Sequence, residues 1–568
     1  MTPAGWAGGL SRVIMRTILV FDSSMSRCLL VVFAILAAAL VTPCAAAESV
    51  RVRILGINDF HGHLEAPLGN AGTTSGAPTG GAAYLAAHVR RLAAASPHHA
   101  FVSAGDLINA SPFVSALFQD EPTIEAMNAA GLMLNAVGNH EFDEGVEELL
   151  RMQRGGCHRR LGCQFRPAFA GARFRFLAAN AVRESGDSPL FPPYEIVGFG
   201  PVRVAFIGVT LQGTAGLVNT EAIAGWRFDS PWRSVNALVP ELRAQGVEAI
   251  VVLLHEGGYG GGGPNDCPSL SGPVRAIVQK FDPAVDAVFT GHTHQSYNCV
   301  VEGRPVTSAG SHGRLITRLD LEIDARSGHV LAAMAHNEAV THDIAPDAAV
   351  AAIVDEAARV ADRHDRVVGT LVRDIDRRGT FPGDIARGGS GESALGSLIA
   401  DAQLWATRKA GAQIALTNPG GLRADLTRRP DERVLFSDLF AVQPFSNHLV
   451  TLTLTGAQLM QLLEQQFAHG RGARVLQVSK GLSYAWRASA PRGARVRDLR
   501  LNGQPLSARA DYRITVNDYL LGGGDRLGAL AAGRDRVVGP LDVEALEAYA
   551  RAHDPLRAPR LGRIRRID

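Results

Sequence analysis

The sequence predicts an α/β protein with more than one domain, and three observations support this. The chain has 568 residues, 46% of them hydrophobic and 20% charged, which is enough to bury sizeable cores. Short apolar runs typical of strands alternate with patterns typical of helices over most of the chain. A polar helix expected at 347–363 separates one such half from a second, and no internal repeat relates the two.

The N-terminus has the pattern of a secretory signal peptide. An apolar run at 28–44 follows Arg27 and precedes three alanines at 45–47, as in a hydrophobic region with a small-residue cleavage site. The run is shorter than the roughly 20 residues of a membrane-spanning helix. We therefore expect residues 1–47 to be removed, leaving a periplasmic or secreted protein without membrane attachment. Translation can start at one of three methionines, Met1, Met15 or Met25.

The charge balance gives no sign of a polyanionic partner. The formal net charge is +2, so no global field favours nucleic acid or an anionic membrane. We expect no nucleic-acid or membrane partner, and a protein that acts as a monomer on a small molecule.

Four cysteines follow the expected signal peptide, an even number in an oxidising compartment. Three pairings are possible. Cys157 and Cys163 flank a short loop, which favours a local disulfide and leaves Cys267 to pair with Cys299. The alternative is a zinc site, but the C-x2-C pairs that such sites use are missing.

Five predicted strands of the first half end in polar side chains. Strands are expected at 50–57, 101–103, 133–137, 173–179, 202–209, 249–254 and 286–289, and helices at 83–95, 122–130 and 144–154. In open α/β sheets, ligands bind beyond the carboxyl ends of the strands. The polar side chains at those ends are Asp59, His61, Asp106, Asn139, His255, His292 and His294.

These seven side chains predict a site for two divalent metals. A single Asp or His of this kind is usually structural or solvated, but five strand ends carry them. All offer oxygen or nitrogen, and two metals about 3.5–4 Å apart need about seven such ligands, one of them shared. Asp59 and His61 are expected on one face of an extended strand end, as are His292 and His294. The mixed ligand set suits Zn, Mn, Co or Fe.

The second half has strands expected at 414–416 and 449–454 and helices at 392–409 and 456–467. Its loops carry Asn-Pro-Gly-Gly-Leu-Arg at 418–423, Gln-Pro-Phe-Ser-Asn at 443–447 and Asn-Asp-Tyr-Leu-Leu-Gly-Gly-Gly-Asp at 517–525. Phe445 and Tyr519 lie in these loops rather than in periodic apolar runs. Either ring alone is core packing about as often as it is a ligand contact, but two rings can sandwich a base.

The order of these blocks resembles a known family. Asp59-Phe-His61, Gly105-Asp106, Gly138-Asn-His-Glu141, His255 and Gly291-His-Thr-His294 resemble the calcineurin-like metallophosphatases. The second half resembles the C-terminal domain of secreted bacterial 5'-nucleotidases and UDP-sugar hydrolases. The resemblance implies a metallophosphatase sandwich of mixed β-sheets flanked by helices at 48–344. A linker helix at 345–368 and a separate α/β recognition domain at 369–568 would follow.

The resemblance also assigns roles in the metal site. One metal would be held by Asp59, His61, Asp106 and His294, and the other by Asp106, Asn139, His255 and His292. In some secreted relatives the position of His294 is Gln or Asn. His140 and Asp143 match a catalytic dyad. The structural alternatives are that His140 is a ligand or a helix-start residue and that Asp143 caps the next helix.

In the second half, the resemblance assigns substrate contacts. Phe445 and Tyr519 match a base clamp, in which the second ring is commonly Phe. Arg423 matches a phosphate-binding residue, Asn418 and Asn447 match nearby polar contacts, and Asp525 matches a ribose contact. A further phosphate-binding arginine is expected, for which Arg387 and Arg377 compete.

The leading expectation is a secreted dimetal phosphohydrolase that removes the 5'-phosphate from nucleoside monophosphates by attack of a metal-activated water. The runner-up is a phosphodiesterase or pyrophosphatase acting on nucleotide sugars, cyclic nucleotides or dinucleotides. Less favoured interpretations are a thiosulfate-cleaving hydrolase, for which the paired aromatics have no obvious purpose, and a binding protein without activity, which should have lost ligands.

Overall fold

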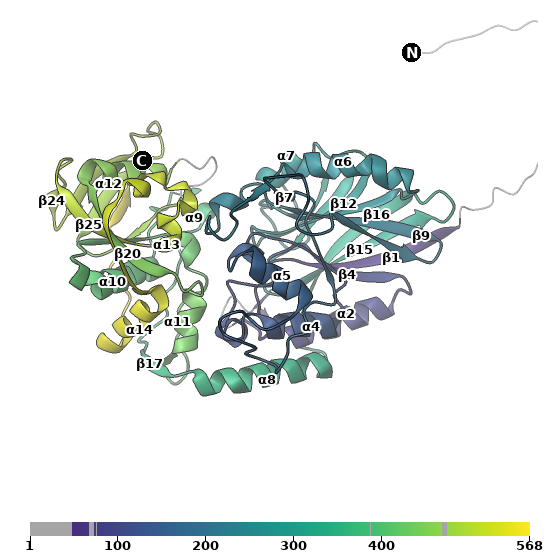
Figure 1. Cartoon of the computed structure of the whole chain (residues 1–568), viewed down its shortest axis with the longest axis horizontal. Coiled ribbons are helices and arrows are strands. Elements are labelled where there is room, and N and C mark those ends of the chain that lie inside the picture. The colour runs from purple at the N-terminus through teal and green to yellow at the C-terminus, as the bar shows by residue number, and fades with distance from the viewer. Residues whose placement is uncertain (1–47, 68–72, 75, 387, 468–473) are drawn as a thin grey trace, which may run out of the picture. The chain divides into compact units, whose positions relative to one another are not determined.

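The computed structural model describes residues 48–67, 73–74, 76–386, 388–467 and 474–568. The expected signal peptide and Arg387 lie outside the described residues. Ser49–Asp568 form one compact unit (Figure 1). No helix within the described ranges is long and apolar enough to cross a membrane.

Two six-stranded mixed sheets make up the first half. In the first, in spatial order, the strands are β16 (Val330–Ala339), β15 (Leu315–Asp324), β1 (Ser49–Ile57), β4 (His99–Ser103), β5 (Leu134–Ala136) and β6 (Arg175–Leu177). In the second they are β13 (Ser296–Val301), β14 (Arg304–Ala309), β12 (Val285–Thr290), β11 (Ala249–His255), β9 (Val202–Thr210) and β8 (Tyr194–Phe199). In the first sheet, β1, β4, β5 and β6 pair in parallel, and β15 and β16 add antiparallel strands on one side. In the second, β14, β12, β11 and β9 pair in parallel, with antiparallel β13 and β8 at the two edges.

The two sheets pack face to face around a shared apolar core. Ile54 and Val102 of the first sheet and Phe206 and Leu253 of the second belong to one buried cluster. All seven residues of β11 are buried, which explains its unbroken apolar sequence. The sheets approach closely at Gly56, where a Cβ atom would lie 2.3 Å from the ring of Phe289.

Helices cover the outer faces of both sheets. The first sheet is covered by α2 (Ala82–Ala94) and α4 (Glu121–Ala130), and the second by α6 (Pro231–Ala244) and α7 (Pro273–Val278). The helix expected at 347–363 is α8 (Ala348–His364), which lies along α2 and α4 in Figure 1. This arrangement confirms the predicted sandwich.

Several boundaries differ from the sequence prediction. The helix expected from 144 is α5 (Val146–Arg154), because His140–Phe142 form a separate 3-10 turn and Gly145 precedes the helix with a positive φ of 91°. The strand expected at 173–179 is only the three-residue β6. The antiparallel strands β13 to β16 were not predicted.

The second half is a separate α/β arrangement, as expected. A five-stranded sheet has the order β21 (Gln477–Val478), β18 (Ile414–Thr417), β25 (Asp511–Asn517), β20 (His448–Thr455) and β26 (Arg534–Leu541). It packs with α10 (Ala394–Thr407), α12 (Gly456–Gln465) and α14 (Asp542–Ala552) around two buried clusters. A four-stranded sheet follows, in the order β24 (Gln504–Pro505), β23 (Val496–Leu501), β22 (Leu482–Trp486) and β27 (Ile564–Arg566).

Both predicted disulfides are present. Cys157 bonds to Cys163, and Cys267 bonds to Cys299. The first closes a surface loop of the first half, and the second joins the loop after β11 to strand β13. The pairing by loop length is therefore confirmed, and the zinc alternative is wrong.

Candidate active site

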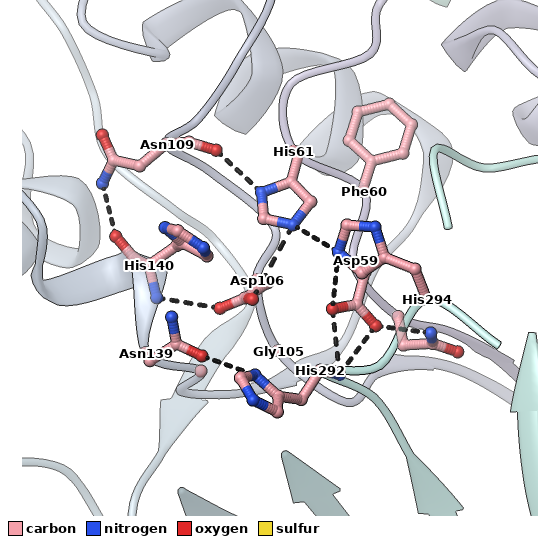
Figure 2. Close-up of polar contacts among 12 residues, drawn as sticks. Asp59, Phe60, His61, Gly105, Asp106, Asn109, Asn139, His140, His292 and His294 are labelled. Carbon is pink, nitrogen blue, oxygen red and sulfur yellow. Dashed lines mark hydrogen bonds and ion pairs between the residues drawn. The ribbon is translucent and has the colours of Figure 1, made fainter. Parts of the chain in front are cut away.

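The carboxyl ends of five strands bring all seven candidate metal ligands together. The strands are β1, β4 and β5 of the first sheet and β11 and β12 of the second. Figure 2 shows most of these side chains pointing toward one another from the loops beyond the strands. Their ligand atoms fall into groups that lie within 4.8 Å of one another, Asp59 with His61 and His294, and Asp106 with His255 and His292.

The first group lies around Asp59. Its Oδ1 is 3.4 Å from Nε2 of His294, which is 3.1 Å from Nε2 of His61. Oδ2 of Asp106 is 3.7 Å from the same His61 nitrogen. These four side chains are the set expected for one metal.

The second group lies on the other side of Asp106. Its Oδ2 is 3.0 Å from Nε2 of His255, and Oδ1 of Asn139 lies 3.3 Å from that nitrogen and 2.9 Å from Nδ1 of His292. Asp106 thus faces both groups, as a bridging ligand must. The donors are carboxylate, imidazole and amide, which fits a calcineurin-like centre for two divalent metals.

Backbone carbonyls fix the orientation of two histidines. Nδ1 of His61 lies 2.8 Å from the carbonyl oxygen of Asn109, and Nδ1 of His255 lies 2.8 Å from that of Ala104. With Nδ1–H donating to the carbonyl, the lone pair of Nε2 is free to bind a metal.

Burial keeps most of these imidazoles neutral. It lowers the pKa of His61 and His294, and it lowers that of His292 to about 3. His255 differs, because the Asp106 carboxylate outweighs burial and raises its pKa to about 10. A cation held there would displace this proton, so metal binding is expected to release a proton.

The ligand loops adopt backbone conformations that a sequence does not reveal. Five ligands have φ between 47° and 69°, in the left-handed region, namely Asp59, His61, Asp106, His292 and His294. Such residues cost about 1–3 kcal/mol each and cluster at functional sites. The expectation of extended strand ends is therefore wrong, although the side chains do converge.

A glycine allows the close packing around Asp106. A Cβ atom on Gly138 would lie 2.2 Å from Oδ1 of Asp106 and 2.6 Å from its backbone nitrogen. Only a residue without a side chain fits between this carboxylate and the candidate ligand Asn139.

The candidate dyad lies against the first metal group. Nδ1 of His140 is 2.7 Å from Oδ2 of Asp143, and the backbone N–H of His140 donates to Oδ1 of Asp106. Burial lowers the pKa of His140, but Asp143 and Asp106 outweigh it and the pKa is raised. The N-cap residue of α5 is Gly145, so Asp143 does not cap this helix. Its carboxylate is hydrogen-bonded to His140.

Glu141 is a buried organising residue, for which the sequence predicted no role. Its carboxylate accepts hydrogen bonds from the backbone N–H groups of Asp106, Leu107 and Gly138 at 2.8–3.0 Å. Asn135 donates a further bond at 3.3 Å. Glu141 therefore ties the loop after β4 to the loop after β5. The only sequence signal was its place between the dyad residues.

We expect Glu141→Gln to destabilise the protein. Glutamine has a single acceptor oxygen, so its NH2 group would face the N–H of Gly138 or Leu107. A buried donor left unsatisfied costs about 1–3 kcal/mol, which urea denaturation would measure. Glu147→Gln, on the exposed face of α5, is the matched control. Equal unfolding free energies for the two variants would contradict this role of Glu141.

Asn109 links the two parts of the site and was also missed. Its carbonyl oxygen accepts from His61, and its side-chain Nδ2 donates to the carbonyl oxygen of His140 at 2.8 Å (Figure 2). Its φ is 63°, and its own N–H donates to Asp120. No sequence pattern distinguishes this asparagine from an ordinary turn residue.

Two predicted residues of the second half reach the candidate metal site and the dyad. Nη2 of Arg423 lies 3.4 Å from Nε2 of His61. The Phe445 ring is stacked on that of His140, with centroids 5.8 Å apart and planes inclined by 19°. Arg423 also lies over the Phe445 ring, at 5.8 Å. A guanidinium and an aromatic face thus border the candidate metal site.

Tyr519 and Asp525 form a second cluster. The N–H of Asp525 donates to the Tyr519 hydroxyl at 3.2 Å, and Arg474 pairs with the buried Asp525 carboxylate. Arg474 lies 51 positions before Asp525, and no sequence motif marks it for this contact.

The remaining predicted contacts have partners within the second half. Asn418 accepts from Nδ2 of Asn517 at 3.3 Å, and Nδ2 of Asn447 donates to Asp542 at 3.2 Å. Among the described residues, no hydrogen bond links these two side chains directly to the candidate metal ligands. Burial, together with nearby Arg423, lowers the pKa of Arg377 to about 10. Of the two arginines that compete for the second phosphate contact, Arg377 lies within the described residues and Arg387 does not.

Comparison with known families agrees with this geometry. Residues 52–296 match the family model for calcineurin-like phosphoesterases, and residues 367–532 match the model for the 5'-nucleotidase C-terminal domain. A solved structure, the 5'-nucleotidase precursor from Thermus thermophilus, aligns with a TM-score of 0.76 at 29% identity. The alignment covers 91% of this chain and 99% of that one.

Two curated relatives are longer than this chain. Endonuclease YhcR of Bacillus subtilis (strain 168) is 33% identical over 530 residues, which is 91% of this chain and 41% of the relative. Cell wall protein Lmo0130 of Listeria monocytogenes is 33% identical over 521 residues, which is 86% of this chain and 65% of the relative. The chain therefore spans less than two thirds of the length of either relative.

Proposed function

Because the chain belongs to the 5'-nucleotidase family of metallophosphoesterases, we propose that it removes the 5'-phosphate from nucleoside monophosphates. The observation that carries this proposal is the position of Arg423 and Phe445. Both come from the nucleotidase-type half, and both lie against His61 and His140 of the metallophosphatase half. A phosphate at the metal site would meet the guanidinium, and the attached nucleoside would meet the phenyl ring.

The roles of the chain's own residues follow from their charges. Two bound divalent cations would polarise the phosphoryl group and lower the pKa of a bound water. Asp143 and Asp106 raise the pKa of His140 and so favour its imidazolium form, which donates a hydrogen bond to the phosphate and can pass a proton to the leaving oxygen. Arg423 neutralises charge on the phosphoryl oxygens. Phe445 and Tyr519 hold the base, and Asp525 the ribose.

We place the protein outside the cytoplasm, with Zn, Mn, Co or Fe as its two metals. Its two disulfides support an oxidising compartment. The name of the relative Lmo0130, a cell wall protein, supports the same placement.

A phosphodiesterase acting on nucleotides is the second candidate. It is favoured by the relative named an endonuclease, which aligns over 91% of this chain. Release of phosphate from AMP in the presence of Mn²⁺ or Zn²⁺, lost on chelation, supports the monoesterase. Turnover of cyclic or dinucleotide substrates with no release of phosphate from AMP would favour the diesterase instead.

We expect Arg423→Ala to lower kcat/KM for AMP by about 10- to 150-fold, the value of one hydrogen bond to a charged group. The half-buried guanidinium lies 3.4 Å from His61, where it would meet a phosphate at the metal site. Steady-state phosphate release measures the effect. Arg428→Ala, which removes an exposed guanidinium paired with Glu432, is the control. If the two variants were equally active, Arg423 would not be a substrate contact.

A further inference from the structure

A cavity of about 390 Å³ lies beside the dyad and has no role in the reaction as described so far. Two of its lining residues touch His140. Asn109 donates to the His140 carbonyl oxygen, and the Phe445 ring stacks on the His140 ring. The cavity therefore lies next to His140, the residue that we expect to contact the substrate phosphate.

The lining of the cavity is acidic. Of its twenty lining residues, four are Asp or Glu and none is Lys, Arg or His. Three of the carboxylates are already engaged within the protein. Asp120 accepts from Asn109 and Ser115, Glu141 accepts from three backbone N–H groups, and Glu148 pairs with Arg151.

The fourth carboxylate, Glu144, is available to a ligand. It forms no hydrogen bond or ion pair with any residue in the described part of the chain, and it is exposed at the cavity. Although the Glu144 side chain is exposed, the protein around it partly desolvates the carboxylate and raises its pKa, as do Asp143, Glu148 and Asp120, so a positive charge beside it would be favoured. Arg160 lies near enough to offset part of this repulsion but does not line the cavity.

Aromatic rings complete the lining. Phe113 and Phe440 meet edge to face with centroids 5.7 Å apart, and Phe445 contributes a third ring. Aromatic faces combined with a carboxylate are the surroundings in which quaternary ammonium groups bind, because the ring quadrupole attracts a cation without hydrogen bonds. A further phosphate would be repelled here.

We propose that this cavity is a second substrate subsite, which takes an organic cation such as a quaternary ammonium group carried on the substrate phosphate. Glu144 is the counter-ion, and Phe113, Phe440 and Phe445 form the walls. The assignment rests on the proposed function, since the cation enters attached to a phosphate at the metal site. It extends the substrates to diesters with one cationic alcohol.

Two diesters of equal shape test this proposal. They are p-nitrophenyl phosphocholine and p-nitrophenyl 3,3-dimethylbutyl phosphate, which differ in having a charged nitrogen or a neutral carbon at one position. With the metal-loaded protein, we expect kcat/KM to favour the choline diester about 5- to 30-fold. Glu144→Gln should remove most of this preference, and Glu147→Gln, which alters a carboxylate outside the cavity, should keep it.

The proposal fails if the two diesters react equally, or if the preference survives in Glu144→Gln. It also fails if AMP is hydrolysed and neither diester is. If neither AMP nor either diester is hydrolysed, the proposed function fails instead, and the cavity assignment is then tested by measuring how tightly the two diesters bind. Calorimetric titration of the metal-loaded His140→Ala variant would then measure the affinity for each diester. Tighter binding of the choline diester, lost when Glu144→Gln is added, would support the cavity assignment. Equal affinities for the two diesters would overturn it.

Discussion

Replacing Asp106 with alanine is expected to abolish hydrolysis and to reduce the metal content of the protein. The Asp106 carboxylate lies between the two candidate ligand groups, 3.0 Å from His255 and 3.7 Å from His61. Its other oxygen accepts the backbone N–H of His140, so the variant also loosens the dyad. We expect activity on AMP to fall by at least about 10³-fold, the larger end of the loss when one electrostatic stabiliser is removed.

Elemental analysis of the purified variant separates loss of the bridging ligand from simple misfolding. The parent protein should hold two metals per chain and Asp106→Ala fewer than one. Asp286→Ala is the control, because the half-buried Asp286 also accepts a backbone N–H, from Ile250, but lies at the start of β12 rather than at its end. A variant that retained two metals and a tenth of the parent activity would rule out Asp106 as the bridge.

The convergence of the ligands within each sheet could be predicted because it follows from strand direction. Parallel strands end at one edge of a sheet, so polar residues placed directly after apolar runs meet there. Strand direction thus brings together Asp59 and Asp106, which follow the neighbouring parallel strands β1 and β4 of the first sheet. Strand direction alone does not place His255, which follows β11 of the second sheet, beside Asp106, because that also requires the two sheets to pack together. It does not predict the left-handed backbone at Asp59 or His292, because the loop conformations depend on contacts with other strands, such as the N–H of His292 donating to Asp59.

The supporting residues could not be predicted for the same reason. Glu141 acts through backbone N–H groups more than 30 positions earlier in the chain, at Asp106 and Leu107. Arg474 acts through Asp525, which is 51 positions later. Neither the residue types nor their local spacing predicts these pairings. A buried carboxylate needs hydrogen-bond donors, but the sequence does not identify which residues provide them.

In the second half, the resemblance to a known family pointed to site residues that the physical properties of the sequence alone did not. Arg423 is one arginine among many, and nothing in its surroundings along the chain marks it as a ligand. Its contact with His61 spans 362 positions and depends on how the two halves pack. Asn418 and Asn447 also match the family pattern, and their side chains are hydrogen-bonded to Asn517 and Asp542. Their substrate contacts stay a prediction.

Replacing His140 with alanine should lower kcat by a larger factor than it changes KM. A positioned proton donor contributes about 10²- to 10⁴-fold to such reactions. His140→Ala removes the donor but keeps the seven candidate metal ligands, so its metal content should match that of the parent protein. Phosphate release from AMP and elemental analysis together test this. A variant that lost both metals would show His140 to be a ligand, which is the alternative that the sequence left open.

The pH dependence of kcat distinguishes a proton donor from a group that only fills space. Burial lowers the pKa of His140, but Asp143 and Asp106 outweigh it, so the imidazolium persists above its ordinary pKa of 6.5. The active form is protonated, and kcat should therefore decline as the pH rises through this raised pKa. Asp143→Asn removes the nearest carboxylate and lowers the pKa of His140, so the decline should begin at a lower pH. Because asparagine can still accept the Nδ1–H bond, the ring keeps its orientation and the shift reports charge alone. If the alkaline limb were identical in the parent protein and in Asp143→Asn, proton donation by His140 would be excluded, and Asp143 would be left with the orientation of the ring as its only role.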